Sequence, residues 1–346
     1  SLCYKKLNMS KKNSNVILKS GFEDYDDLSK IFLNFKQKIL SLKKKNFVIA
    51  VSGGPDSLAL AALAKALSFQ QKIKFFYILI NHNIRKNSLN EAEKVKNLLK
   101  KHSINLQIFS NKEKITKNIQ SNARVIRYKM ISKFSSKKGV RYILTAHNLE
   151  DQVETFFIRL SRGSGLTGLS SMREFSVFQE KSILFRPLLS VKKKKLVSIS
   201  KIIFGKYFKD PSNNNKKYLR TKIRSLQKPL FQSGINYDQV IKSINNLAAS
   251  QATLDEYFNI ISKKIIKKSK KRILINLNSF KNLNLELKIR IINDSIKMLK
   301  KNYYNPRAKK VINLINTFEA NRPSRAILSG CIFERTGPLL MVKKEQ

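Results

Sequence analysis

The sequence predicts an α/β fold: a doubly wound, mainly parallel sheet, followed by a mostly helical C-terminal region with a terminal β-hairpin. Two patterns support this prediction. Up to about residue 162, apolar runs of strand length alternate with segments of helix length, and repeated strand–helix units form parallel sheets covered by helices on both faces. From about residue 236 onward, the apolar residues recur at helical spacing instead.

The first pattern predicts the elements of the sheet in order. The expected strands are 47–51, 75–80, 106–109 and 141–146, and the helices that follow them are 57–67, 88–101, 119–138 and 149–162. A capping-box spacing from Ser88 to Glu91 opens the second helix, and Gly139 and Gly163 are suited to end the last two. Ligands of such sheets bind beyond the carboxyl ends of the strands.

The second half of the chain carries fewer strand signals. Residues 163–190 are loop-rich, and Lys192–Lys195 is most simply a solvated charge run or a non-specific phosphate contact. The remaining expected elements are helices at 237–264, 285–300 and 307–318, and hairpin strands at 326–334 and 339–343 around Thr336-Gly337-Pro338.

The charge balance predicts a polyanionic partner. The chain has 346 residues, and its 70 Lys and Arg against 22 Asp and Glu give a net charge of +48. Drift toward lysine in composition explains part of this surplus, but it explains the scarcity of acidic residues less well. Nucleic acid is therefore the leading partner, because each neutralised phosphate releases counterions.

Other classes of protein receive little support from the sequence. No uncharged apolar run approaches the ~18–20 residues that span a bilayer, and the N-terminus lacks the apolar core of a signal peptide. The two cysteines, Cys3 and Cys331, belong to no CxxC pair, so a disulfide framework, a cysteine zinc site and an iron–sulfur cluster are poorly supported. We expect a cytoplasmic protein with no membrane association.

The sharpest motif is the phosphate loop Ser52-Gly53-Gly54-Pro55-Asp56-Ser57, which joins an expected strand to an expected helix. The glycines allow close backbone approach, the helix start attracts anions, and the two serines add hydroxyl donors. The loop lacks the lysine of a Walker A motif. Asp56 would repel phosphates unless a cation lay between them, which favours Mg²⁺. An ordinary strand–turn–helix connection is the alternative.

Further candidates lie near the other strand ends. His147, Asp151 and Glu154 have the spacing of one helical face and could bind a metal, accept protons or hold a cationic substrate; a solvated polar face is the alternative. Two arginine pairs, at helical spacings of three and four, could stabilise phosphate charge or contact RNA, or could be solvated. These pairs are Arg124 with Arg127, and Arg220 with Arg224.

The phosphate loop resembles that of the N-type ATP pyrophosphatases, or PP-loop family, and four further segments resemble the tRNA(Ile)-lysidine synthetases within it. The segments run in the family's order from about residue 47 to 230. They are Asn81-His82-Asn83-Ile84-Arg85 with Ser88 and Glu91-Ala92; Ala123-Arg124 with Arg127-Tyr128; residues 145–155 with 162–165; and residues 186–189 with Asp210-Pro211-Ser212-Asn213, Tyr218, Arg220, Ile223 and Arg224. One departure is Asn81, where the family usually has Asp, which casts doubt on a metal or ribose role there.

The resemblance implies an ATP-dependent ligase that joins free L-lysine to C2 of the wobble cytidine in a CAU-anticodon isoleucine tRNA, through an adenylated tRNA. ATP would be held by residues 52–57 and His82, with Mg²⁺ on Asp56. Asp56, Arg124, His147, Asp151 and Glu154 are the implied catalytic residues, and Arg127, Arg220 and Arg224 would contact tRNA or nucleotide.

Alternatives to this function are a thiolating PP-loop tRNA enzyme, a small-molecule ligase such as NAD synthetase, and an inactive tRNA-binding module. Thiolation generally needs cysteines, and both lie far from the motifs. The implied organisation is a flexible basic leader at 1–20, a catalytic domain at 21–230, a helical tRNA-binding domain at 231–322 and a hairpin element at 323–346. The oligomeric state stays open, with a homodimer as one option.

Overall fold

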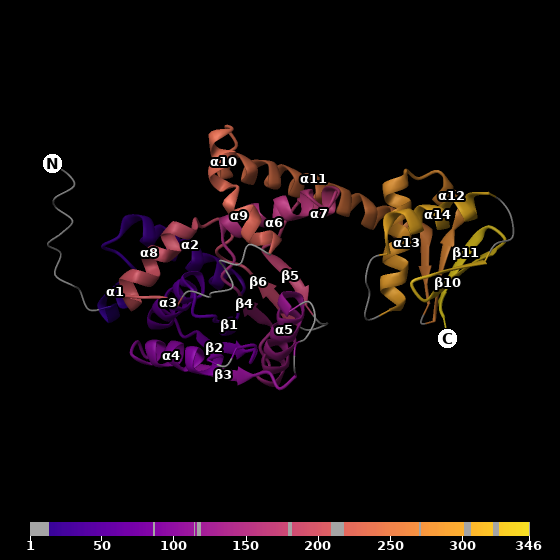
Figure 1. The fold of residues 1–346 in the computed structure, drawn as a ribbon. Coiled ribbons are helices and arrows are strands. Elements are labelled where there is room, and N and C mark those ends of the chain that lie inside the picture. The colour runs from indigo at the N-terminus through magenta and orange to yellow at the C-terminus, as the bar shows by residue number, and fades with distance from the viewer. Residues whose placement is uncertain are drawn as a thin grey trace. The chain divides into compact units, whose positions relative to one another are not determined.

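The computed structural model describes residues 14–85, 87–113, 115, 119–178, 182–208, 218–269, 271–300, 306–320 and 325–345. The chain forms two compact units, one that ends at Ala248 and one that begins at Ala249 (Figure 1). The division of function expected at residue 230 stays a prediction. No helix within the described ranges is long and apolar enough to cross a membrane.

The first unit contains the predicted mainly parallel sheet, sheet A. Its strand order is β3-β2-β1-β4-β6-β5, and every neighbouring pair is parallel except β5–β6. The strands are β1 (Asn46–Ala50), β2 (Lys74–Asn81), β3 (Leu106–Ser110), β4 (Tyr142–Leu144), β5 (Phe175–Phe178) and β6 (Ser182–Phe185). β5 and β6 lie in the stretch expected to be loop-rich, so that expectation was wrong for these two short strands, of which β5 forms the edge of the sheet.

Helices cover both faces of sheet A. The helices that begin in the first unit are α1 (Ser14–Ser20), α2 (Asp26–Ser41), α3 (Pro55–Gln70), α4 (Ser88–Lys100), α5 (Ile119–Lys137), α6 (Leu149–Leu160), α7 (Leu166–Leu169), α8 (Lys193–Phe204), α9 (Leu219–Ser225), α10 (Gln227–Gln232) and α11 (Tyr237–Ile265). The bounds of α3, α4, α5, α6 and α11 are close to the predicted ones, whereas the other six helices were not predicted. The capping box expected from Ser88 is absent: Asn87 is the N-cap, and its side chain makes no capping hydrogen bond.

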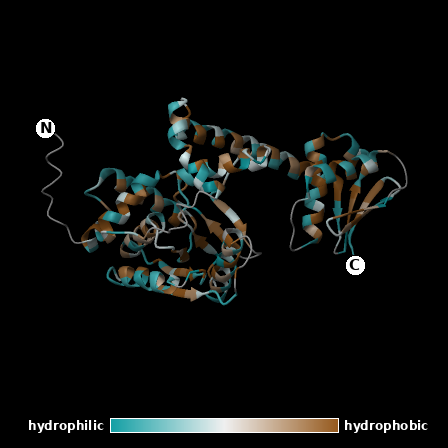
Figure 2. Cartoon of the chain, viewed as in Figure 1, coloured by the Kyte–Doolittle hydropathy of each residue, from teal (hydrophilic) through white to brown (hydrophobic). Residues whose placement is uncertain are grey.

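Alternating side chains of each strand build two cores. Phe47 and Ile49 of β1 pack toward α2, α3 and α8, whereas Val48 between them packs toward α5 on the other face. The central strands are accordingly hydrophobic except at their end residues (Figure 2). Helix α1 also joins this core through the buried Ile17 and Leu18, so residues 14–20 of the expected leader are folded, while residues 1–13 lie outside the described ranges.

The second unit contains the predicted helices and also a five-stranded antiparallel sheet. The strand order is β7-β8-β11-β10-β9. The elements are β7 (Ile266–Lys268), β8 (Arg272–Asn276), α12 (Leu277–Lys281), α13 (Leu285–Leu299), α14 (Ala308–Glu319), β9 (Arg325–Leu328), β10 (Cys331–Thr336) and β11 (Leu339–Lys344). The predicted hairpin is β10–β11, but a turn at residues 329 and 330 divides its expected first strand, 326–334, into β9 and β10. The sequence did not predict that β8 pairs with β11 or that β7 pairs with β8.

Candidate functional site

The candidate site lies at the carboxyl ends of the parallel strands. β1 lies between β2 and β4, so the chain crosses from one side of β1 to the other after β3. Open α/β sheets bind ligands at such a switch point. Three predicted segments meet this edge: residues 52–54 follow β1, residues 81–82 end β2, and residues 145–148 follow β4.

The loop from Ser52 to Ser57 turns directly into the N-terminus of α3. Gly53 has a φ of +80°, and an added Cβ would lie 2.6 Å from Cγ2 of Val95, so only glycine fits. The Ser57 hydroxyl accepts a hydrogen bond from the Ser52 N–H at 3.1 Å and donates one to the Gly54 carbonyl at 3.0 Å. A braced loop at the positive end of a 16-residue helix suits a phosphate group.

The charge of the Asp56 carboxylate is only partly compensated by neighbouring side chains. Its Oδ1 is buried and has no hydrogen-bond partner among the described residues, while Nζ of Lys193 lies 4.0 Å from Oδ2. Burial raises the pKa of Asp56 from 3.8 to about 6; Lys193 opposes this shift and Asp151 adds to it. Such an oxygen beside a phosphate loop fits a Mg²⁺ ion.

No group of three or more metal-ligating side chains occurs within the described ranges. This is compatible with Mg²⁺, because that ion commonly uses one or two carboxylates and takes its other ligands from phosphates and water. The surroundings of the Asp56 carboxylate therefore fit the expected metal, because its buried Oδ1 has no hydrogen-bond partner among the described residues.

The second strand end carries His147, Asn148 and Asp151. Helix α6 begins at Leu149, so His147 lies in the preceding loop, and the expectation that it shares a helical face with Asp151 and Glu154 was wrong. Asn148 Oδ1 accepts the Asp151 N–H at 2.9 Å, and Asp151 Oδ2 accepts the Asn148 N–H at 3.2 Å. This reciprocal capping box fixes the Asp151 carboxylate at the edge of the sheet.

Both site histidines are held in the neutral form. Burial, together with nearby arginines, lowers the pKa of His147 to about 3, despite the opposing effect of Asp151. Its Nδ1 lies 2.9 Å from the Thr145 hydroxyl. Burial, and then Arg127, lower the pKa of His82 to about 4, and the Arg127 Nε donates to the His82 Nε2 at 3.4 Å.

Glu154 joins α6 to α9 through two arginines. It is only 3% exposed, and its carboxylate accepts hydrogen bonds from Arg220 Nε at 2.8 Å and from Arg224 Nε at 2.5 Å. Nη2 atoms of the same arginines lie 3.6 and 3.9 Å from Oδ1 of Asp151. The predicted acidic pair and the predicted arginine pair therefore form one cluster.

Two further arginines flank the site. Arg124 is exposed, and its guanidinium lies over the ring of Tyr128, 5.0 Å from the centroid. Arg186 is buried after β6; it donates to the Arg173 carbonyl and to the Ser176 hydroxyl at 2.8 and 3.0 Å. Charge from both reaches His147, where they are among the groups that lower its pKa.

Asn81, the departure from the family pattern, has a structural role. Its side chain is buried and its Nδ2 donates to Asn83 Oδ1 at 2.7 Å, while its Oδ1 accepts the Asn83 N–H at 3.1 Å. Asn83 in turn donates to the Asn111 carbonyl at 2.8 Å. This amide network holds the turn after β2 and the backbone of His82.

The sequence analysis missed contributions from Lys193 and Glu150. The run Lys192–Lys195 was expected to be solvated, but three of its lysines pair with Asp238, Asp56 and Asp27. The Glu150 carboxylate accepts the Lys193 N–H at 2.8 Å, which holds the start of α8 beside the phosphate loop. The run starts three residues after the end of the Arg186-Pro187-Leu188-Leu189 motif, a signal that could have placed it near the site. Asp210-Pro211-Ser212-Asn213 lies outside the described residues.

A phosphate loop at the switch point of a parallel sheet defines a nucleotide-using enzyme of the PP-loop class. The sequence model of the PP-loop domain matches residues 27–230. A U34-tRNA thiolase from Methanococcus maripaludis has a similar structure, with a TM-score of 0.52 and 18% identity over 63% of this chain and 80% of that one, which shows a shared fold.

Two curated relatives indicate which family of PP-loop enzymes the chain belongs to. The tRNA(Ile)-lysidine synthase of Wolbachia pipientis wMel is 30% identical over 302 residues, covering 86% of this chain and 70% of the relative. That of Orientia tsutsugamushi is 36% identical over 221 residues, covering 63% and 49%. The chain belongs to the tRNA(Ile)-lysidine synthase family of PP-loop ATP-using ligases.

Proposed function

We propose that this chain joins L-lysine to C2 of the wobble cytidine in an isoleucine tRNA with a CAU anticodon, through an adenylated tRNA, and releases AMP and pyrophosphate. The observation that carries the proposal is the meeting of the phosphate loop with the Asp151–Glu154–arginine cluster at one edge of sheet A. The phosphate loop suits the phosphates of ATP, and the Asp151–Glu154–arginine cluster suits the tRNA acceptor and the lysine amine.

For the first step, the cytidine C2 oxygen attacks the α-phosphorus of ATP, and the bond to pyrophosphate breaks. Residues 52–57 and the start of α3 would hold the pyrophosphate, with His82 beside the nucleotide. Asp56 would hold Mg²⁺, which neutralises phosphate charge when bound. Arg124 and Arg127 are the proposed donors to charge that develops on the phosphates.

For the second step, the lysine ε-amine attacks C2, the C2–oxygen bond breaks, and AMP leaves. The amine has an ordinary pKa of about 10.4, so it must lose a proton first. Glu154 accepts close hydrogen bonds from Arg220 and Arg224, whereas the Asp151 carboxylate lies farther from the same arginines, at 3.6 and 3.9 Å. His147 is a weak base because its pKa is lowered to about 3. We therefore propose Asp151 as the proton acceptor, with Glu154 positioning Arg220 and Arg224.

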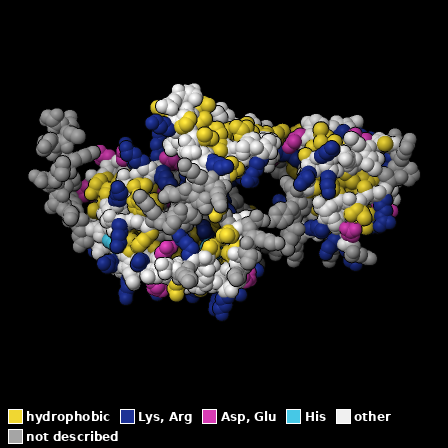
Figure 3. Space-filling view, in the orientation of Figure 1, with side chains coloured by type: hydrophobic (Ala, Val, Ile, Leu, Met, Phe, Trp, Pro, Cys, Tyr) yellow, Lys and Arg dark blue, Asp and Glu magenta, His cyan; other side chains and the backbone are white. Residues whose placement is uncertain are grey.

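The tRNA substrate fits the surface charge of the chain. Lys and Arg side chains are spread over the visible face of each unit, whereas Asp and Glu are sparse (Figure 3). Thiolation receives no support from the described residues, because Cys331 is buried in the second unit's core; Cys3 lies outside the described ranges. The intact phosphate loop argues against the inactive module.

The test combines the protein with ATP, Mg²⁺, labelled L-lysine and a CAU-anticodon isoleucine tRNA transcript. We expect label in the RNA and an equal amount of pyrophosphate, with the CAU-anticodon initiator tRNA as the negative control. Pyrophosphate without label would point to another nucleophile. The absence of both signals from folded protein would refute the proposal. Asp56→Ala should abolish both signals but keep tRNA affinity, whereas the surface variant Asp27→Ala should keep all three.

A further inference from the structure

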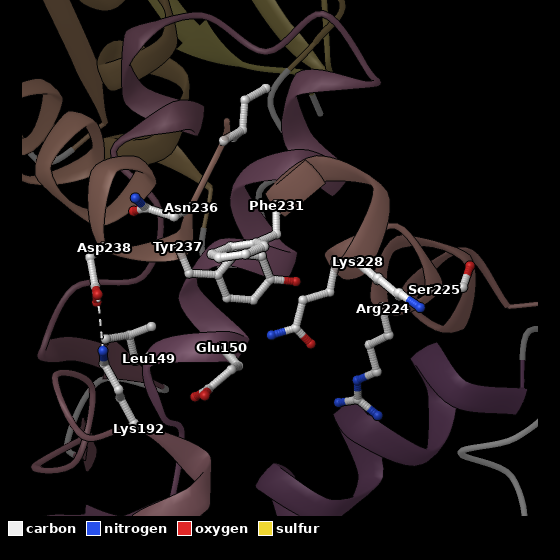
Figure 4. Close-up of a pocket in the computed structure, with 12 residues that line it drawn as sticks. Leu149, Glu150, Lys192, Arg224, Ser225, Lys228, Phe231, Asn236, Tyr237 and Asp238 are labelled. Atoms are coloured by element: carbon white, nitrogen blue, oxygen red, sulfur yellow. Dashed lines mark hydrogen bonds and ion pairs between the residues drawn. The ribbon is translucent and has the colours of Figure 1, made fainter. Parts of the chain in front are cut away.

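A pocket of about 520 Å³ opens beside the Asp151–Glu154–arginine cluster, here called the catalytic cluster. The pocket lies among the start of α6, the α9–α10 turn and the start of α11 (Figure 4). Its walls combine two aromatic rings with three cationic and two acidic side chains, which are those of Phe231, Tyr237, Arg224, Lys228, Lys192, Glu150 and Asp238. This volume is ample for a nucleotide-sized ligand. None of the steps proposed above uses it.

Tyr237 provides a fixed platform in this pocket. It packs against the small core formed by Leu149 and Val153 of α6, which restrains its ring. Its pKa is raised first by burial and then by Glu154 and Glu150, so the phenol lies within the electrostatic reach of the catalytic cluster. The ring is therefore held in place before any ligand arrives.

Phe231 is the aromatic group that lacks cover. It is 70% exposed, and the neighbouring Leu226 and Ile235 are also exposed. Leaving a phenylalanine in water forgoes most of the stabilisation that its burial would supply. Figure 4 shows the Phe231 side chain projecting from α10 into the pocket, on the side where Tyr237 also projects. An exposed ring above a polar cavity is typical of a stacking surface for a base.

The charges around the rings favour a nucleic-acid ligand over an apolar one. Arg224 belongs both to this pocket and to the Glu154 cluster, so it links the two sites. Lys228 lies on the same wall, and Lys192 lies across the pocket in an ion pair with Asp238 at 2.9 Å. Cations beside aromatic faces recognise a base together with its phosphate.

We infer that this pocket binds an unstacked nucleobase of the tRNA anticodon loop, adjacent to the cytidine under reaction, with Phe231 as the stacking ring. The inference rests on the proposed function. A single-stranded loop must be splayed to bring one base to chemistry, and its neighbour then loses its stacking partner. An aromatic group next to the catalytic cluster would replace that partner and hold the loop open.

The test replaces Phe231 and measures each substrate separately. Phe231→Ala should raise the KM for tRNA and weaken tRNA binding at least about fivefold, the effect of losing one base–aromatic stack. The KM values for ATP and lysine should not change. Phe231→Trp should retain wild-type binding, whereas Phe231→Leu should not, because it keeps apolar area but no ring. Phe69→Ala, another exposed phenylalanine in the first unit, is the matched control.

A direct signal comes from 2-aminopurine placed at each anticodon-loop position in turn, because stacking on an aromatic ring quenches its fluorescence. One position should be quenched by the wild-type protein and by Phe69→Ala but not by Phe231→Ala. No such position, or an altered KM for lysine with unchanged tRNA binding, would overturn the inference. These binding measurements need no lysine transfer, so failure of the proposed function would be seen separately, as absence of labelled RNA.

Discussion

Asp56→Asn should stabilise the folded protein at neutral pH while abolishing pyrophosphate release. The Asp56 side chain is 23% exposed, and its Oδ1 has no hydrogen-bond partner among the described residues. Burial is the main cause of its raised pKa. Asparagine keeps the shape of the side chain and removes the poorly solvated charge. The substitution therefore raises the stability of the fold and removes the carboxylate that the reaction needs.

The size of the effect follows from the pKa of Asp56, which rises from 3.8 to about 6. About two units at ~1.4 kcal/mol each give roughly 3 kcal/mol. A raised pKa in the folded state means that the folded protein binds the proton more tightly, so ionisation of Asp56 lowers the stability as the pH rises. The loss is absent below about pH 4, about half developed near pH 5 and complete above about pH 7.

The assay is denaturant unfolding followed by circular dichroism, without nucleotide, at pH 7.5 and pH 5. The free energy of unfolding of Asp56→Asn should exceed that of wild type by up to about 3 kcal/mol at pH 7.5 and by about half as much at pH 5. Asp27→Asn, a change to an exposed acid paired with Lys195, should lose at most about 1 kcal/mol. Lower stability of Asp56→Asn at pH 7.5, or an equal gain at both pH values, would refute the reasoning.

Three further predictions concern the same site and the surface. Glu154→Gln should lower the free energy of unfolding by roughly 2–3 kcal/mol, since a buried pair that loses one partner costs ~3–5 kcal/mol and the arginines here are partly solvated. Calorimetry should show little change for Glu93→Gln, because the Glu93 side chain is 44% exposed in its pair with Lys96; equal effects of the two substitutions would contradict the role of Glu154 in the cluster. The lowered pKa values of His82 and His147 predict that neither ring titrates between pH 5.5 and 8 in NMR spectra, and that their contribution to stability is lost as the pH falls below about 6.5; a mid-range titration would be the contrary result. Binding of tRNA should weaken by orders of magnitude between about 50 and 200 mM salt, and a flat response would remove the electrostatic argument.

Long apolar strands were the most predictable part of the fold. β1 and β2 are buried on both faces, so their side chains are hydrophobic without interruption and the pattern identifies them directly. β5, at the sheet edge, leaves Val177 largely exposed, and β7 is a short strand between lysine-rich segments. Such strands are defined by pairing with distant partners, which local sequence does not encode.

The candidate site divides in the same way. The phosphate loop was predictable because the residues that carry its chemistry are consecutive in the sequence. One of them, Gly53, has a φ of +80°, a conformation that favours glycine. The pairing of Glu154 with Arg220 and Arg224 joins residues about seventy positions apart, so the sequence could name the groups but not their contact. The place of Lys193 beside Asp56 was hidden by the lysine run around it.

The central claim is that the C2 oxygen of the tRNA attacks ATP at the loop around Asp56. A tRNA carrying ¹⁸O at C2 of the wobble cytidine tests it directly, with mass analysis of the AMP and pyrophosphate after lysine transfer. We predict ¹⁸O in the phosphate of AMP and none in pyrophosphate, since that oxygen stays on phosphorus when the amine displaces AMP. Unlabelled AMP in a reaction that still forms lysidine would contradict the account.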